Sequence, residues 1–136
     1  MSISATVTYV SDNTFDCMLV QEILRRAFPE TCFSCVPDGQ EFLSQLQTMP
    51  RHELPKAIVM DFFCAGMSGY RLAGHIRSVE GCEKIPFIFL GDSLSPFVEE
   101  LLASTTDAIY VHRSMDLEQM ERDIEQALRR ALQAPG

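Results

Sequence analysis

The chain has no long apolar segment, no cationic leader and no excess of basic residues. No stretch approaches the roughly 20 apolar residues that a membrane-spanning helix needs. The first residues, Met1-Ser-Ile-Ser-Ala-Thr6, lack the positive charge and the apolar core of a signal peptide. Lys and Arg number 11 against 19 Asp and Glu, and the net charge of −8 argues against general binding to nucleic acid or anionic membrane. We therefore expect a cytoplasmic protein that binds neither nucleic acid nor membrane directly.

Cysteine is sparse and does not form a metal-binding pattern. The five cysteines are an odd number, which fits a reducing compartment. Cys32-Phe-Ser-Cys35 has CxxC spacing, but these residues are typical of a strand, on which side chains three apart face opposite sides. No second CxxC occurs, and the three histidines are scattered. The cysteines are therefore expected to be packing thiols rather than a metal or redox pair.

Several motifs of phosphate and acyl chemistry are also missing. The turn Ser11-Asp-Asn-Thr-Phe15 has no glycine, so it cannot form the loop that cradles the phosphate of a flavin or nucleotide. GxxxxGK[ST] does not occur, and a hydrolase that uses DxD after a strand would need an acid where Phe63 stands. Ser, His and Asp are not arranged as a nucleophile elbow. These absences exclude the commonest phosphate-binding and hydrolytic sites of α/β proteins.

What the sequence does contain is a regular alternation of strand and helix patterns. The 136 residues suit one domain, 1–136. Apolar and β-branched runs predict strands at 5–10, 32–36, 57–60, 86–90 and 108–111. Helical spacing predicts helices at about 14–28, 41–49, 70–79, from 95 onward, and 116–132. This order predicts an α/β fold, a flavodoxin-like doubly wound (βα)5 sandwich with a parallel five-stranded sheet in the order 2-1-3-4-5.

The chain is organised around the segment from Lys56 to Gly69. Its apolar run ends in Asp61 and is followed by a loop with two glycines. Ligand sites of parallel sheets lie at the carboxyl ends of the strands, where Asp12 closes the neighbouring first strand. Two converging carboxylates are suited to a hard cation such as Mg²⁺, and one carboxylate can accept a phosphoryl group. The alternative is that both aspartates merely cap helices.

The pattern resembles the receiver domain of two-component response regulators, the CheY-like family, over nearly the whole chain. The resemblance is carried by six short segments in the family's order and spacing. They are Val10-Ser-Asp12, Pro37-Asp-Gly-Gln-Glu-Phe-Leu43, Ile58-Val-Met-Asp-Phe-Phe63, Met67-Ser-Gly-Tyr70, Ile85-Pro-Phe-Ile-Phe-Leu90 and Asp116-Leu-Glu118.

The resemblance implies a set of site residues, with departures from the family pattern. Asp61 matches the phosphoacceptor, and Asp12 together with the backbone carbonyl of Phe63 matches the ligands of Mg²⁺. Ser11 stands where the first metal-binding acid is expected, and Cys64-Ala65 replaces the usual Met-Pro. Gly91 replaces the Ser or Thr that hydrogen-bonds the phosphoryl group.

The family's Lys-Pro pair is missing, and two alignments of this segment are possible. One places His112 at the lysine position. The other runs back without a gap from Asp116-Leu-Glu118 and places Arg113 at the lysine and Tyr110 at the switch aromatic. The second is preferred because it explains three positions at once. An arginine could still meet a phosphate, although its planar fork differs from the point charge of an ammonium group.

These departures imply an atypical, degenerate receiver rather than an enzyme. We expect a signal-transduction module that binds a protein partner through the fourth helix, fifth strand and fifth helix. Phosphorylation would be weak or irrelevant, and Mg²⁺ binding weak or absent. Because Gly91 has no hydroxyl to swing, Tyr110 is not expected to turn on phosphorylation.

The alternative is a conventional Mg²⁺-dependent receiver that is phosphorylated on Asp61 by a histidine kinase, with Asp12 and Arg113 assisting. A third interpretation is a small-ligand sensor that uses the vacated acidic pocket. The partner is thus expected to be a histidine kinase or a downstream effector, and a homodimer is possible.

Overall fold

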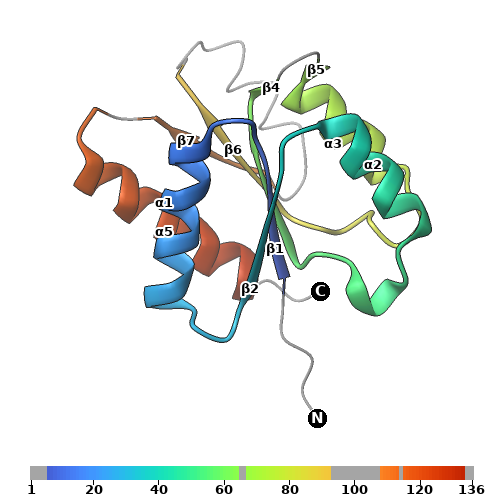
Figure 1. Cartoon of the computed structure of the whole chain (residues 1–136), viewed down its shortest axis with the longest axis horizontal. Coiled ribbons are helices and arrows are strands. Elements are labelled where there is room, and N and C mark those ends of the chain that lie inside the picture. The colour runs from blue at the N-terminus through green and yellow to red at the C-terminus, as the bar shows by residue number, and fades with distance from the viewer. Residues whose placement is uncertain (1–5, 65–66, 93–107, 114, 134–136) are drawn as a thin grey trace.

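A computed structural model of the chain describes residues 6–64, 67–92, 108–113 and 115–133 (Figure 1). Its centre is a parallel sheet of five strands in the order β2-β1-β3-β6-β7. The strands are β1 (Thr6–Val10), β2 (Cys32–Val36), β3 (Ala57–Asp61), β6 (Phe87–Gly91) and β7 (Ala108–His112). The predicted flavodoxin-like, doubly wound α/β fold is confirmed, because the strand order reverses at β1 and β3 as expected.

Helices cover both faces of this sheet (Figure 1). One face carries α1 (Thr14–Ala27) and α5 (Leu117–Gln133), and the other carries α2 (Gly39–Thr48) and α3 (Gly69–Arg77). Each face has its own apolar cluster, one around Tyr9 and Val59, the other around Ile58 and Phe89. Successive residues of a strand point to opposite faces, so β1 and β3 contribute to both clusters.

The burial of the strands follows their place in the sheet. All residues of β3 and β6 are buried, whereas β2, an edge strand, is largely exposed. Continuous apolar runs such as Ala57–Met60 are what a strand covered on both faces requires. Polar groups at the ends of β1 and β3 are therefore held in a dry environment, where each needs a partner.

Three short elements were not predicted. An antiparallel pair, β4 (Phe63–Cys64) and β5 (Met67–Ser68), follows β3, and a 3₁₀ turn, η1 (Arg51–Glu53), precedes it. Next to this antiparallel pair, the Gly69 amide donates a hydrogen bond to the Phe62 carbonyl at 2.5 Å. A Cβ on Gly69 would lie 3.2 Å from the Phe62 Cα and closer still to the Asp61 carbonyl, so glycine allows this approach.

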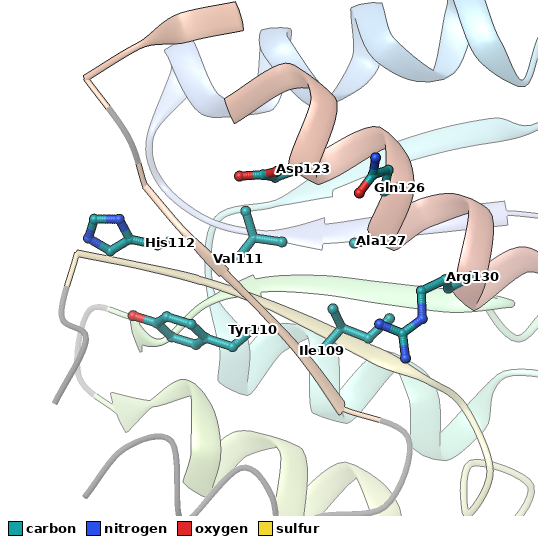
Figure 2. A pocket seen from close by; sticks show the side chains of 8 residues that line it. All are labelled: Ile109, Tyr110, Val111, His112, Asp123, Gln126, Ala127 and Arg130. Carbon is teal, nitrogen blue, oxygen red and sulfur yellow. The ribbon is translucent and has the colours of Figure 1, made fainter. Parts of the chain in front are cut away.

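The second edge strand, β7, borders a groove that it forms with α5 (Figure 2). The groove has a volume of about 210 Å³. It is lined by Ile109, Tyr110, Val111, His112, Asp123, Gln126, Ala127 and Arg130. The helix predicted from residue 95 onward lies outside the described residues. Within the described part of the chain, no helix is long and apolar enough to cross a membrane.

Candidate functional site

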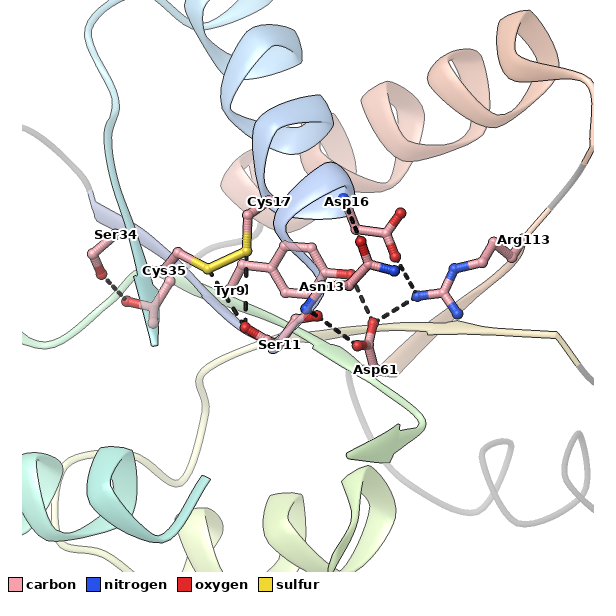
Figure 3. The surroundings of a disulfide bond; sticks show 10 residues. Tyr9, Ser11, Asn13, Asp16, Cys17, Ser34, Cys35, Asp61 and Arg113 are labelled. Carbon is pink, nitrogen blue, oxygen red and sulfur yellow. Dashed lines mark hydrogen bonds and ion pairs between the residues drawn. A yellow bond between two sulfur atoms is a disulfide. The ribbon is translucent and has the colours of Figure 1, made fainter. Parts of the chain in front are cut away.

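Asp61, the last residue of β3, is the centre of a buried polar cluster (Figure 3). The residue is only 8% exposed. Its Oδ1 accepts a hydrogen bond from the Tyr9 hydroxyl at 2.7 Å, and its Oδ2 accepts one from the Ser11 hydroxyl at 2.6 Å. Tyr9 belongs to β1, and Ser11 directly follows it. The pairing of β1 with β3 therefore places both residues next to Asp61. These two hydrogen bonds, one to each oxygen, fix the orientation of the carboxylate.

The cation of the cluster is Arg113, which directly follows β7. Its Nη2 donates to Asp61 Oδ1 at 2.8 Å and to Asp16 Oδ2 at 2.6 Å. Its Nη1 lies 3.5 Å from Asp92 Oδ1, although the Asp92 side chain is largely in solvent. The Arg113 amide donates to the Gly91 carbonyl at 2.8 Å, which fixes the start of the side chain beside β6. One guanidinium group thus bridges two buried carboxylates.

The charges in this cluster shift the pKa values of its members. Burial raises the pKa of the Asp16 carboxyl, and the nearby Arg113 offsets only part of that effect. Burial alone would lower the pKa of Arg113, but the carboxylates of Asp16 and Asp61 outweigh it and raise this pKa. Burial, and next the negative charge of Asp61, raise the pKa of the Tyr9 phenol far above its ordinary range. Tyr9 therefore remains a hydrogen-bond donor at neutral pH.

Next to this cluster, at the end of β6, Tyr110 lies over Gly91. A Cβ on Gly91 would lie 3.0 Å from Tyr110 Cζ and closer still to the hydroxyl. The ring also packs edge-on against Phe62, with centroids 6.1 Å apart and an interplanar angle of 78°. The space that a side chain at position 91 would need is therefore filled by the tyrosine.

The structure brings some of the predicted site residues together and leaves others apart. Asp61, Ser11 and Arg113 come together, whereas His112 points its ring toward the Asp92 carbonyl, with Nε2 at 3.2 Å from that oxygen. Asp12 is exposed and makes no hydrogen bond or ion pair with any described residue. Phe63 lies in β4, opposite Ser68. The acid that meets the Asp61 cluster is therefore Asp16, in the first turn of α1 and four residues after Asp12.

Asp16 and Tyr9 were missed in the sequence analysis, although both left a signal. Asp16 is 3% exposed and continues the buried stripe of α1, because it precedes Val20 by four residues and Ile23 by seven. An acid on an apolar face needs a buried partner. Tyr9 likewise stands at a fully buried position of β1, where a phenol requires an acceptor.

The prediction that the cysteines are packing thiols was wrong for Cys17 and Cys35, which form a disulfide (Figure 3). The alternation of side chains along β2 turns Cys35 away from the face of Cys32 and toward α1, where Cys17 lies. Cys32 is a free, exposed thiol and Cys82 a buried one. The CxxC spacing involves only Cys32 and Cys35, so it gives no indication of a pairing between helix and strand.

Several solved structures of similar fold are response regulators or receiver domains. The phosphorylated cyanobacterial phytochrome response regulator RcpA is 20% identical, covers 98% of each chain and has a TM-score of 0.83. The chemotaxis response regulator CheY4 of Vibrio cholerae is 19% identical over 96% of this chain and 100% of its own, with a TM-score of 0.76.

A third similar structure is the receiver domain of a sensor histidine kinase from Pseudomonas aeruginosa, solved with a magnesium ion coordinated in its active-site cleft. It is 20% identical over 93% of this chain and 98% of its own, with a TM-score of 0.69. No family description matches the sequence, and no curated protein is similar to it. The chain therefore has the fold of response-regulator receiver domains, at a level of identity that shows the fold alone.

The residues around Asp61 do not fit a bound Mg²⁺. This ion takes one or two carboxylates and completes its shell with waters and phosphate oxygens. Here Asp61 already accepts hydrogen bonds on both oxygens, and a guanidinium nitrogen lies 2.8 Å from one of them. Ser11 supplies only a neutral oxygen, and its proton is directed at Asp61. In the ranges that the structure describes, no three His, Cys, Asp or Glu residues are grouped as metal ligands.

Proposed function

We propose that the chain is an atypical receiver module of signal transduction, which binds a protein partner without requiring phosphorylation of Asp61, and that it is not an enzyme. The observation that carries this proposal is the Arg113 bridge between Asp61 and Asp16. The Arg113 guanidinium, which is part of the chain, lies 2.8 Å from the carboxylate oxygen to which a free cation would have to bind. Mg²⁺ binding is accordingly weak or absent, because a second cation there would be repelled.

The same bridge lowers the capacity of Asp61 to act as a nucleophile. A carboxylate oxygen attacks with a free lone pair, and each hydrogen bond it accepts stabilises the charge that would have to be delivered. Oδ1 accepts from both Tyr9 and Arg113, and Oδ2 from Ser11. Transfer of a phosphoryl group would also require Ser11 or Arg113 to release its bond. Modification of Asp61 is therefore slow or absent.

The packing of Tyr110 on Gly91 supports a binding surface that does not change when Asp61 is phosphorylated. In the receiver family, the hydroxyl at the end of the fourth strand moves toward the phosphoryl group and the aromatic follows it. Here the aromatic already fills the space beside position 91. A modification of Asp61 therefore has little differential free energy with which to move this ring.

The surface we propose for the partner includes the groove between β7 and α5 (Figure 2). Its lining combines an apolar floor, with Val111 and Ala127, and charged groups at the rim, with Asp123 and Arg130. Such a combination is typical of protein interfaces, which surround an apolar centre with polar residues. The fourth helix, which also belongs to the expected interface, lies outside the described residues.

The test is to add Mg²⁺ and beryllofluoride, a mimic of the phosphoryl group, and to record backbone amide NMR spectra. We expect no saturable shifts in β7 and α5 of the natural chain. The matched control is Ser11→Asp combined with Gly91→Thr and Arg113→Lys, which restores the residues expected of a conventional receiver. This control should gain Mg²⁺ affinity by about tenfold or more, since a carboxylate replaces a neutral oxygen and an ammonium replaces the bridging fork.

A conventional phosphoacceptor remains the second candidate, and the position of Asp61 at the end of β3 favours it. Saturable shifts that spread through β7 in the natural chain would support this candidate and overturn our proposal. Once a binding partner has been identified, Asp61→Asn distinguishes the two candidate functions. Our proposal requires the partner affinity to fall by less than about 1 kcal/mol, whereas loss of binding would favour the conventional candidate.

A further inference from the structure

A disulfide joins the first turns of α1 to the edge strand β2, through Cys17 and Cys35. The two Cα atoms are 6.4 Å apart, within the usual range for this bond. The two residues are separated by 18 positions in sequence, and the bond joins α1 to β2 beside Ser11. It lies on the same side of the sheet edge as Tyr9, Asp16 and Asp61 (Figure 3).

Both sulfurs lie against the backbone of Ser11. Cys17 Sγ is 3.9 Å and Cys35 Sγ 3.7 Å from the Ser11 carbonyl oxygen. The Ser11 amide donates to the carbonyl of Val36, the neighbour of Cys35, at 3.0 Å. The Ser11 hydroxyl donates to Asp61. A change at the sulfurs therefore acts on a residue that contacts Asp61 directly.

Reagents in solution can reach this pair. Cys35 is exposed, and Cys17 is half-buried at the start of α1. Exposed disulfides are generally more easily reduced than disulfides in a core. The chain also carries a free, exposed thiol, Cys32, on the same strand. A permanent disulfide framework usually leaves no such thiol, because an accessible thiolate can exchange with a neighbouring disulfide.

We propose that Cys17 and Cys35 form a reversible thiol–disulfide site which reacts with small disulfides such as glutathione disulfide and which controls how firmly Ser11 holds Asp61. In the oxidising direction, the exposed Cys35 thiolate attacks one sulfur of glutathione disulfide, and one glutathione leaves as its thiolate. The Cys17 thiolate then displaces the second glutathione from Cys35. Two electrons pass from the protein pair to the small disulfide, and the two protons of the protein thiols end on the two glutathiones at neutral pH.

The first experiment identifies the reacting cysteines. The full chain is equilibrated with mixtures of reduced and oxidised glutathione, quenched with a maleimide under denaturing conditions and analysed by intact mass and peptide mapping. We expect labelling to fall from five thiols to three as the oxidised form increases, since two of the five cysteines pair. Cys32→Ser should lose the same two thiols as the natural chain.

Cys35→Ser and Cys17→Ser distinguish the roles within the pair. Cys17→Ser should stop at a mixed disulfide on Cys35, because no second thiol can displace the glutathione. A Cys32–Cys35 bond in the natural chain, or labelling that stays at five thiols in every mixture, would overturn the proposal. Should either variant fold poorly by circular dichroism, the natural chain compared before and after reduction provides the same mapping.

The second experiment tests the connection to Asp61. Backbone amide NMR spectra of the reduced and oxidised chain are compared, with Cys32→Ser as the control that keeps the pair. We expect the Ser11 and Asp61 amides to shift together with those around Cys17 and Cys35. Shifts confined to α1 and β2 would refute control of Asp61. Neither experiment uses phosphorylation or a partner, so a failure here is separate from a failure of the proposed function.

Discussion

Two features lie at the carboxyl ends of the strands, the Asp61 cluster and the Gly91–Tyr110 contact. Different forces stabilise them. The first is a charge arrangement of Asp16, Asp61 and Arg113 with short hydrogen bonds. The second is an aromatic side chain packed into the space above a glycine. The two features face different apolar clusters, since Tyr9 belongs to the cluster under α1 and Tyr110 packs on the cluster under α3.

Under the function we propose, the two responses expected of a receiver are missing for independent reasons. In the charged cluster, the guanidinium of Arg113 pairs with the Asp61 carboxylate. In the aromatic region, Gly91 has no side-chain hydroxyl that could hydrogen-bond a group on Asp61. Restoring only one of the two regions should therefore not restore a response to phosphorylation, which is why the control variant above changes both.

The largest effect should come from Arg113→Met in the charged cluster. The change leaves Asp16 and Asp61 buried without their cation, and breaking such a bridge costs about 3–5 kcal/mol. The Arg113 side chain is 24% exposed, which favours the lower end of this range. The loss is measured as the free energy of unfolding in urea at pH 7.

Arg113→Lys is the matched control for this change, because it keeps the charge but not the fork. It should cost clearly less than Arg113→Met. Equal losses for the two variants would mean that packing of the side chain, rather than its charge, stabilises the cluster.

Gly91→Ala should be the next most disruptive change, and it acts on the aromatic region. The added Cβ overlaps the Tyr110 hydroxyl, and overpacking of this kind costs about 1–3 kcal/mol. The double variant with Tyr110→Leu should recover most of the loss, since the overlapping atoms are removed. Additive losses in this double-mutant cycle would show that the two residues do not share the space.

A smaller effect is expected for Tyr9→Phe, which removes one of the donors to Asp61. A hydrogen bond to a charged group contributes about 1.5–3 kcal/mol, and we expect the lower part of this range because Arg113 still donates to the same oxygen.

The pH dependence of Tyr9 has a definite sign. Burial and the charge of Asp61 raise the pKa of the folded-state phenol above the value of about 10 in the unfolded chain. Stability from this group is therefore complete below pH 10 and is lost as the pH rises, by up to about 1.4 kcal/mol per pH unit. Tyr9→Phe should show a weaker decline between pH 9 and 11 than the natural chain. Parallel curves would contradict this assignment.

The smallest effect should come from Asp12→Asn. Asp12 is exposed and makes no hydrogen bond or ion pair with the described residues, so the change in unfolding free energy should stay within about 0.5 kcal/mol. Asp16→Asn is the matched variant in the first turn of α1 and should cost more, since it weakens the 2.6 Å interaction with Arg113. Equal effects would mean that Asp12 takes part in the cluster after all.

The comparison of Asp12 with Asp16 also shows where prediction of the site from sequence succeeded and where it ended. The position of Asp61 was predictable, because a buried apolar run that ends in an acid marks the carboxyl end of a strand. Asp16 was not selected, since an acid in a first helical turn normally remains in solvent as a favourable partner of the helix dipole. Only the Asn13 cap, which accepts from the Asp16 amide, and the return of Arg113 after β7 make it a buried partner.

The sequence by itself determined the order of strands and helices and the parallel sheet, because the period of the apolar residues is a local property. It also determined that a serine stands at position 11 and a glycine at position 91. The tertiary structure alone decided that Arg113 bridges Asp16 and Asp61, that Tyr110 covers Gly91, and that Cys17 meets Cys35. Each of these contacts joins residues from separate elements, and its geometry depends on strand register and helix rotation, which no local pattern specifies.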